Sequence, residues 1–207
     1  MEEKKNLSEE EKKRLERFEQ ISGEMTAKGY TRKDLTVDIG KAKTFGLFLI
    51  IPLAVIGYGL YYLVNHKLEF SAGPNVFVFF ITILVLTVLH ELIHGITWSL
   101  FTPNHFKDIQ FGILKPSMTP YCTYLCTLGK WQHLTGTVMP LIVLGIIPML
   151  IGVFAKNPYL LLLGIIMADA AAGDIMIIHR LLTYKTDAKE IVYMDHPTSA
   201  GGVIFER

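Results

Sequence analysis

The sequence contains few charged residues and few cysteines for a chain of 207 residues. Charged side chains make up 19% of it, and the formal net charge is +1. A chain this close to neutral, which also has no phosphate-binding loop, gives no reason to expect a nucleic-acid partner. The two cysteines, Cys122 and Cys126, are too few for a disulfide framework, and their C-x-x-x-C spacing differs from that of zinc ribbons and redox pairs. We interpret them as ordinary reduced thiols.

The first 29 residues lack the apolar core that follows the basic residues of a secretion signal, so we expect no cleaved signal there. This segment is dense in charge instead, and Leu15, Phe18 and Ile21 recur in it at helical spacing. The pattern predicts an amphipathic helix. Residues 30–40, which follow it, predict a short extended stretch.

Long apolar runs dominate the rest of the chain, which is 51% hydrophobic with a mean hydropathy of +0.37. Residues 44–64 carry no charge, and their length suits a hydrocarbon core of roughly 30 Å. Further apolar runs cover about 76–101, 134–154 and 159–182. We therefore predict an all-α membrane protein with about four transmembrane helices, the third of them kinked at Pro140 and Pro148.

The distribution of Lys and Arg predicts the orientation of these helices. Most of them lie in the N-terminal region, in residues 102–133 and in the C-terminal tail. Positive residues favour the cytoplasmic side, so we expect a multi-pass protein of the cell membrane with both termini in the cytoplasm. The expected regions are a cytosolic amphipathic region near the membrane surface (1–40), a four-span membrane domain (41–183) and a cytosolic tail (184–207).

The second apolar run contains the motif H-E-x-x-H, formed by His90, Glu91 and His94. Two histidines at i and i+4 lie on one face of a helix, where both can bind one cation. Glu91 then lies beside the metal and can act as a base on bound water. Ionisable groups are costly in a membrane-spanning segment, which favours a functional explanation. We predict a zinc site.

Zinc needs a third protein ligand here, and the candidates inside the membrane are Asp169, Asp174 and His179. We favour Asp174, because Gly173 and an alanine run let its helix approach the second span and because its depth matches that of the histidines. On a straight helix Asp169 projects about 140° away from Asp174, so it would instead orient a histidine or line a wet cavity. The other histidines fall in polar segments: His105, His133 and His196.

Residues 102–133 separate the second and third spans, and their three prolines and two glycines exclude a spanning helix. Strand-like DIQFGIL and turn-rich KPSMTP predict a cytosolic loop or short β-ribbon beside the metal site. The edge of such a ribbon can hold a substrate segment as an added strand. Candidates for stabilising an oxyanion stay open: His105, Lys107 and Lys115.

Two functions fit these features. The leading hypothesis is a membrane-embedded zinc metallopeptidase that acts on a membrane or membrane-proximal polypeptide. In it, Glu91 takes a proton from water and passes it to the leaving amine. The alternative is a non-enzymatic, metal-stabilised membrane scaffold or regulatory protein. The sequence does not predict an oligomeric state.

Five stretches carry a resemblance to a known family: HELIHG, the PYC segment, the proline-bearing third span, AGD, and DHPTSAGG in the tail. Together they resemble a family of small bacterial membrane proteins described as zincin peptidases. More distantly, the layout is similar to the site-2 protease class of intramembrane metalloproteases. The resemblance implies that His90, His94 and Asp174 bind Zn²⁺ and that Glu91 is the general base. Ile175 follows Asp174 where the site-2 signature has glycine, so substrate handling is not carried over.

Overall fold

The computed structural model describes residues 9–73, 75–114 and 119–207, and it is mostly helical with two small sheets. The helices are α1 (Glu9–Ala27), α2 (Ile39–Asn65), α3 (Val76–Ser99), α4 (Lys130–Pro140), α5 (Ile147–Phe154), α6 (Pro158–Ala170) and α7 (Ala172–Thr183). The strands are β1 (Thr31–Thr36), β2 (Ile109–Leu114), β3 (Thr119–Tyr124), β4 (Leu128–Gly129), β5 (Ile191–Asp195) and β6 (Gly201–Glu206). The expectation of an all-α protein is therefore incomplete.

Three helical stretches of the described chain are long and apolar enough to cross a membrane: α2, α3 and the continuous stretch Lys130–Phe154. A fourth is obtained if α6 and α7 count as one span. These two helices are bent by 47° at Ala171, so the last predicted span is broken rather than straight. The expected set of about four apolar segments is present, in three to four helical spans.

The third span contains an irregular segment between its two prolines. Residues Leu141–Ile146 form a π-helix, η3, between α4 and α5. Pro148 has no backbone N–H, and its ring crowds the carbonyl of the residue four positions earlier. A locally widened turn relieves this crowding, so the irregularity arises where the sequence predicts it.

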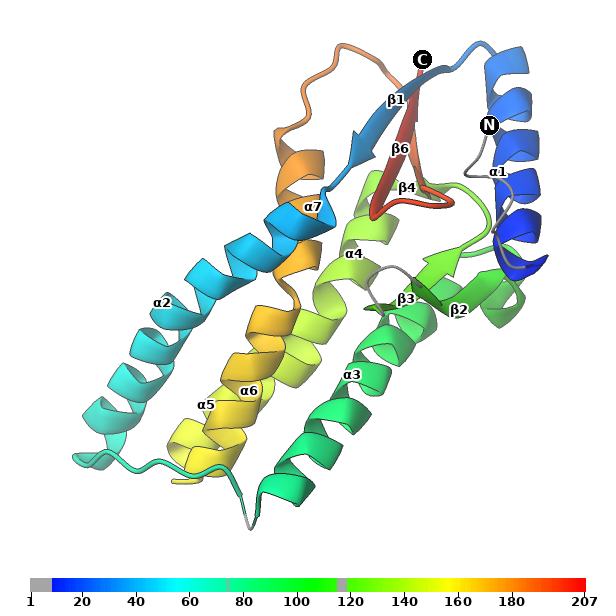
Figure 1. Ribbon diagram of the computed structural model, residues 1–207. Coiled ribbons are helices and arrows are strands. Elements are labelled where there is room, and N and C mark those ends of the chain that lie inside the picture. The colour runs from blue at the N-terminus through cyan, green and yellow to red at the C-terminus, as the bar shows by residue number, and fades with distance from the viewer. Residues whose placement is uncertain (1–8, 74, 115–118) are drawn as a thin grey trace.

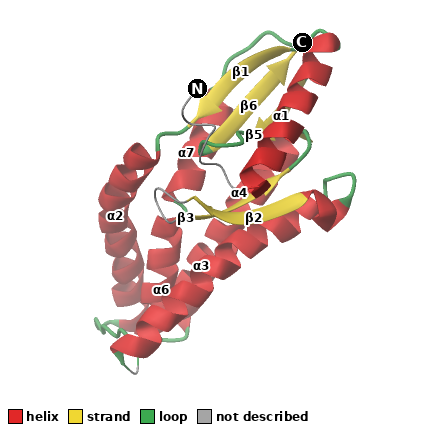
Figure 2. Ribbon diagram, turned by 45° about the vertical axis from the view of Figure 1, so that its right-hand side comes forward, coloured by secondary structure: helices red, strands yellow, loops and turns green. Residues whose placement is uncertain are grey.

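The larger sheet joins segments that are far apart in the sequence. Its strand order is β1-β6-β5-β4, and all neighbouring strands are antiparallel. One face is covered by α1, the predicted amphipathic helix, as Figure 2 shows. The buried side chains in this contact are Phe18, Ile21 and Met25 from α1, with Met194, Val203 and Phe205 from the sheet. We predicted an extended segment for β1 but not its pairing with the C-terminal tail.

The smaller sheet is an antiparallel ribbon of β2 and β3, which pair from Ile109↔Tyr124 to Leu114↔Thr119. A 3₁₀ turn, η2 (His105–Asp108), leads into it from α3. The β-ribbon predicted between the second and third spans is confirmed, whereas its cytosolic position stays a prediction.

The two ends of the molecule differ in character. Figure 1 shows the larger sheet, α1 and the β2–β3 ribbon at one end of the helices, and the α2–α3 loop and the α5–α6 turn at the other. Asp38, whose side chain accepts a hydrogen bond from the Lys41 backbone, caps α2 at the sheet end. The predicted region boundaries at residues 40/41 and 183/184 and the cytoplasmic orientation of the termini stay predictions.

Candidate metal centre

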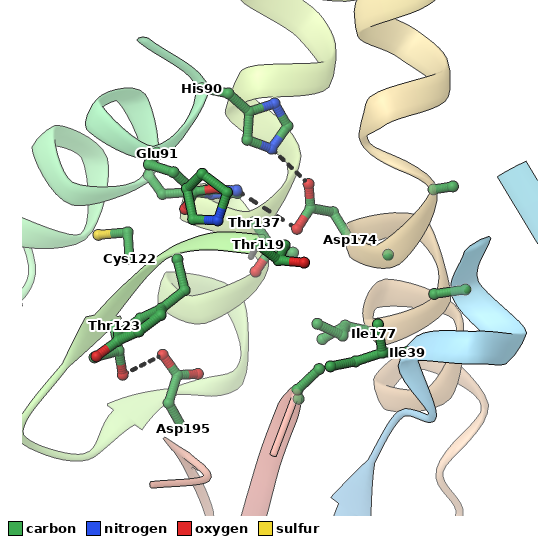
Figure 3. Close-up of a pocket in the computed structure, with 18 of the residues that line it drawn as sticks. Ile39, His90, Glu91, Thr119, Cys122, Thr123, Thr137, Asp174, Ile177 and Asp195 are labelled. Carbon is green, nitrogen blue, oxygen red and sulfur yellow. Dashed lines mark hydrogen bonds and ion pairs between the residues drawn. The ribbon is translucent and has the colours of Figure 1, made fainter. Parts of the chain in front are cut away.

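Two histidines and one aspartate from different helices meet at the sheet end of the helices. His90 and His94 lie one turn apart on α3, and Asp174 lies in the first turn of α7. His90 Nε2 is 3.1 Å from Asp174 Oδ2, and His94 Nε2 is 3.5 Å from Asp174 Oδ1. The three ligand atoms of this group lie within 4.8 Å of one another. Figure 3 shows His90 and Asp174 facing each other across the site.

The donor set fits a zinc ion. Two imidazole nitrogens and one carboxylate form a hydrolytic type of zinc site that leaves a position open. The His94 Nδ1–H donates a hydrogen bond to the Gly136 carbonyl at 2.8 Å, which leaves the Nε2 lone pair directed at Asp174. Both histidines are buried, with 7% and 4% of their surface exposed. Buried polar groups of this kind need partners, and a metal ion would supply one.

The break between α6 and α7 separates Asp169 from Asp174, the two aspartates of the fourth apolar run. Asp174 joins the histidines, whereas Asp169 lies before the break and does not belong to the metal group. The Asp169 Oδ1 is buried without a hydrogen-bond partner, and both of its carboxylate oxygens lie 3.6 Å from where a side chain at Gly46 would begin. A side chain at Gly173 would meet nothing within 4 Å, so the close approach that we expected there does not position Asp174. The third membrane candidate, His179, is exposed.

A stack of aromatic rings supports His94 from the side of α4. Trp98 stacks on His94 with ring centroids 4.9 Å apart, and it stacks on His133 at 5.7 Å. The Trp98 indole N–H donates to the His133 carbonyl at 3.1 Å. His133 uses both of its ring nitrogens, with the Tyr124 hydroxyl at 2.8 Å and the Thr137 hydroxyl at 3.2 Å. These residues hold His94 in place. Sequence reasoning set His133 aside because it falls in a polar segment, and it did not single out Trp98, Tyr124 or Thr137.

Glu91 lies on the same helix as the two histidines and lines the cavity with them. The backbone amide of Cys122, in β3, is directed at its carboxylate.

Burial raises the pKa of the Cys122 thiol, and it raises the pKa of the Cys126 thiol to about 12. Both cysteines are free thiols, and raised pKa values keep them in the unreactive protonated form. This agrees with their interpretation as ordinary reduced thiols.

A cavity of about 490 Å³ adjoins the metal group. Its walls come from α2, α3, β3, α7 and the turn between β5 and β6. The rim residues Lys43, Thr198 and Ser199 are exposed, so water can reach the buried ligands. Asp195 also lines the cavity, as Figure 3 shows, and sequence reasoning missed it. The DHP stretch, which contains Asp195 and contributes to the family resemblance, is the sequence feature that could have pointed to it.

Two of the three earlier candidates for oxyanion stabilisation are not among the residues that line this cavity. His105 and Lys107 are in η2, and neither belongs to the described residues that line the cavity. The His105 Nδ1 instead lies 3.1 Å from the Ser99 carbonyl oxygen. Lys115 is outside the described residues.

This arrangement of an H-E-x-x-H helix with a carboxylate from another helix is that of a zincin. Residues 83–189, more than half of the chain, match the model of the family described as "Putative zincin peptidase". The chain belongs to this family, and the family implies a zinc cofactor. The matched region contains the histidines, Glu91 and Asp174, whereas Asp195 lies beyond it. No curated protein and no solved structure matches the chain.

Proposed function

We propose that this protein is a membrane-embedded zinc metallopeptidase, which hydrolyses a peptide bond in or near the membrane. The observation that carries the proposal is the open cavity beside His90, His94 and Asp174, because a purely structural metal site is closed by its ligands. Membership of a zincin peptidase family supports the same class of reaction.

Each residue of the site would have a separate role in the proposed hydrolysis. His90, His94 and Asp174 would hold the ion, and Gly136 would fix the tautomer of His94. A zinc ion bound there would polarise the scissile carbonyl and make a water molecule acidic enough to lose a proton near neutral pH. Glu91 would accept that proton and then deliver it to the leaving amine.

The location of the site in a membrane is supported by the surface of α2 and α3. In their most apolar stretches, only 11% and 6% of the residues are buried inside the protein. Large apolar side chains such as Phe48, Leu63, Phe77 and Phe80 are therefore exposed. An apolar surface this large is typical of helices that face lipid.

The substrate would bind as an extended strand beside β3. Among the described strands, β3 pairs only with β2, so no described strand covers its other edge. Residues Thr119 to Thr123 line the cavity, and the Cys122 amide reaches Glu91, so this edge runs past the proposed base. Peptide addition to a sheet edge exposes an unwound backbone for cleavage.

The decisive experiment compares ligand and base variants of the purified full-length protein. We expect about one zinc ion per chain in the wild type, and loss of zinc in His94→Ala and Asp174→Ala. Glu91→Gln should keep its zinc but lose hydrolysis of a quenched-fluorescence peptide library by a factor of at least about 100. Glu24→Gln, an exposed change on α1, is the matched control.

The outcomes separate the proposed enzyme from a metal-stabilised scaffold. In a scaffold, the ligand variants would lose thermal stability together with zinc, and Glu91→Gln would behave as the wild type in every assay. Full hydrolysis by Glu91→Gln, or a zinc-loaded wild type that cleaves no peptide in the library, would count against the peptidase.

A further inference from the structure

Asp195 lies at the end of the cavity away from the metal group. It is the last residue of β5, and Figure 3 shows its carboxylate beside Thr123. The Thr123 hydroxyl donates a hydrogen bond to Asp195 Oδ2 at 2.9 Å, and the backbone amide of Tyr124 is directed at the same carboxylate. Both donors are neutral, so they orient the carboxylate without balancing its charge.

Within the part of the chain that the structure describes, no ion pair to this carboxylate is present. Two positive groups act on it at longer range: the buried Arg14 of α1, which also lines the cavity, and, when protonated, His94. The Arg14 guanidinium lies 4.5 Å from the centre of the Tyr121 ring. Burial nevertheless raises the pKa of Asp195 to about 7, so these charges do not offset the loss of water. A cationic ligand in the cavity would supply the countercharge that the described residues do not bring into contact with this carboxylate.

The strand β3 sets the distance between Asp195 and the proposed base. The amide of Cys122 is directed at Glu91, and the amide of Tyr124, two residues further along, is directed at Asp195. Alternate amides of a strand point to the same edge, about 7 Å apart. Both carboxylates therefore lie along the same edge of β3, each beside one of two amides that are two residues apart.

We propose that Asp195 is a specificity-determining residue whose carboxylate binds a lysine or arginine side chain of the substrate, close to the scissile bond. This inference rests on the proposed peptidase function and names its substrate class: membrane-proximal polypeptides with a basic residue near the cut site. Such residues are frequent where a membrane-spanning segment meets the cytoplasm.

The test uses zinc-binding probes rather than an unidentified substrate. Acetylated tripeptide hydroxamates carry either lysine or norleucine, which has a similar length without the charge, at the first or second residue from the hydroxamate. Their dissociation constants are measured by calorimetry on the zinc-loaded full-length protein in detergent. We expect lysine to bind about ten-fold or more tightly than norleucine at one of the two positions.

The Asp195 variants identify the source of that preference. Asp195→Asn should bring the lysine-to-norleucine ratio close to one while the norleucine probe keeps its affinity and the protein keeps its zinc. Asp195→Glu should retain a preference, and Asp34→Asn, a change in an exposed carboxylate of β1, should leave the ratio unchanged. A merely structural role for Asp195 would weaken both probes alike.

Three results would overturn the inference. Equal binding of the lysine and norleucine probes by the wild type would overturn it, and this result does not depend on whether Asp195→Asn folds. Retention of the preference in Asp195→Asn would assign it to another residue, and loss of zinc from that variant would place Asp195 in the support of the metal site. If no hydroxamate binds the zinc-loaded protein, that result contradicts the proposed peptidase function itself, on which the inference about Asp195 rests.

Discussion

The imidazole of His94 is restrained by a hydrogen bond at one ring nitrogen and by a stacked ring on one face. Its Nδ1–H donates to the Gly136 carbonyl, and its Nε2 lies 3.5 Å from Asp174 Oδ1. The ring face is covered by Trp98. A histidine restrained in this way loses little freedom when it binds a metal, which raises the affinity of the site.

Asp195 provides a prediction about pH at the scale of one residue. Burial raises the pKa of its carboxyl from 3.8 to about 7, so the folded protein holds this proton more tightly than the unfolded chain does. Its contribution to stability is therefore complete below about pH 4 and is lost as the pH rises through about 7. Each pKa unit corresponds to about 1.4 kcal/mol, which gives a change of a few kcal/mol.

We expect Asp195→Asn to remove this dependence. The free energy of unfolding of the wild type, measured relative to that of Asp195→Asn with both proteins zinc-loaded, should fall between pH 4 and pH 7. A difference that stays constant over this range would show that the carboxyl titrates normally in the folded protein.

At the scale of elements, α3 and α4 approach each other closely because Gly136 has no side chain. A Cβ at this position would lie 2.1 Å from the Trp98 indole nitrogen. The same close approach brings the Gly136 carbonyl to His94. Packing between two helices thus determines the orientation of a proposed metal ligand.

Gly136→Ala should weaken zinc binding without touching a ligand. The added methyl group displaces Trp98 and moves the Gly136 carbonyl away from His94, so we expect the zinc affinity to fall about 10- to 100-fold. Competition with a chelator of known affinity measures the change. Gly23→Ala, on α1 with nothing within 4 Å of the added group, is the control. Equal affinities in the two variants would refute the link between packing and binding.

The pair α5 and α6 depends on glycine for a different reason. A Cβ at Gly152 would lie 2.4 Å from the backbone nitrogen of Leu161, and a Cβ at Gly164 would lie 2.4 Å from that of Met149. In lipid, the burial of apolar surface gives little driving force for helix association. Close contact of helix backbones at small residues therefore stabilises such a pair.

Gly152→Ala should destabilise the folded protein by about 1–3 kcal/mol, because the backbone of α6 must move. Gly59→Ala is the matched control, since it lies in α2 with open space around the added group. It should be neutral or stabilising by up to about 1 kcal/mol, because alanine favours a helix. Thermal unfolding in the same detergent compares the two, and a more stable Gly152→Ala would contradict the packing argument.

At the scale of the whole molecule, the elements divide between two ends. The larger sheet, α1 and the β2–β3 ribbon lie at one end, and the α2–α3 loop lies at the other (Figure 1). The metal group belongs to the first end, since His94 is near the C-terminus of α3 and Asp174 is in the first turn of α7. If the helices cross a membrane, these ends lie on opposite sides of it. The excess of Lys and Arg in the first group predicts that its side is the cytoplasm.

Cysteine labelling in intact cells tests this topology. In a chain whose two native cysteines are replaced, a cysteine at Lys67 should react with a membrane-impermeant maleimide, and a cysteine at Asp187 should react only after the cells are opened. Both positions are exposed in the structure. The reverse pattern would invert the orientation, and labelling of both positions in intact cells would contradict the membrane arrangement.

The sequence alone determined the features that depend on neighbouring residues. The apolar runs predicted the helices α2 and α3 and the third span, since their length and composition are local properties. The spacing of His90, Glu91 and His94 predicted their common location on α3, because the pitch of a helix is fixed. The strand-like composition of DIQFGIL and the turn-rich KPSMTP likewise predicted a loop or short ribbon there, and the structure has the ribbon.

Only the tertiary structure decided the features that join distant segments. Local patterns do not encode which strands pair. The β1-β6-β5-β4 sheet, which joins β1 near the N-terminus, the two-residue strand β4 and the C-terminal strands β5 and β6, could therefore not be predicted. The break at Ala171, which separates Asp174 from Asp169, arises where the packing changes: both helices contact α2, but α6 also packs on α5 and η3, whereas α7 packs on α4 and β1. Asp195 enters the cavity because β5 ends beside β3, and the two strands are more than sixty residues apart in sequence.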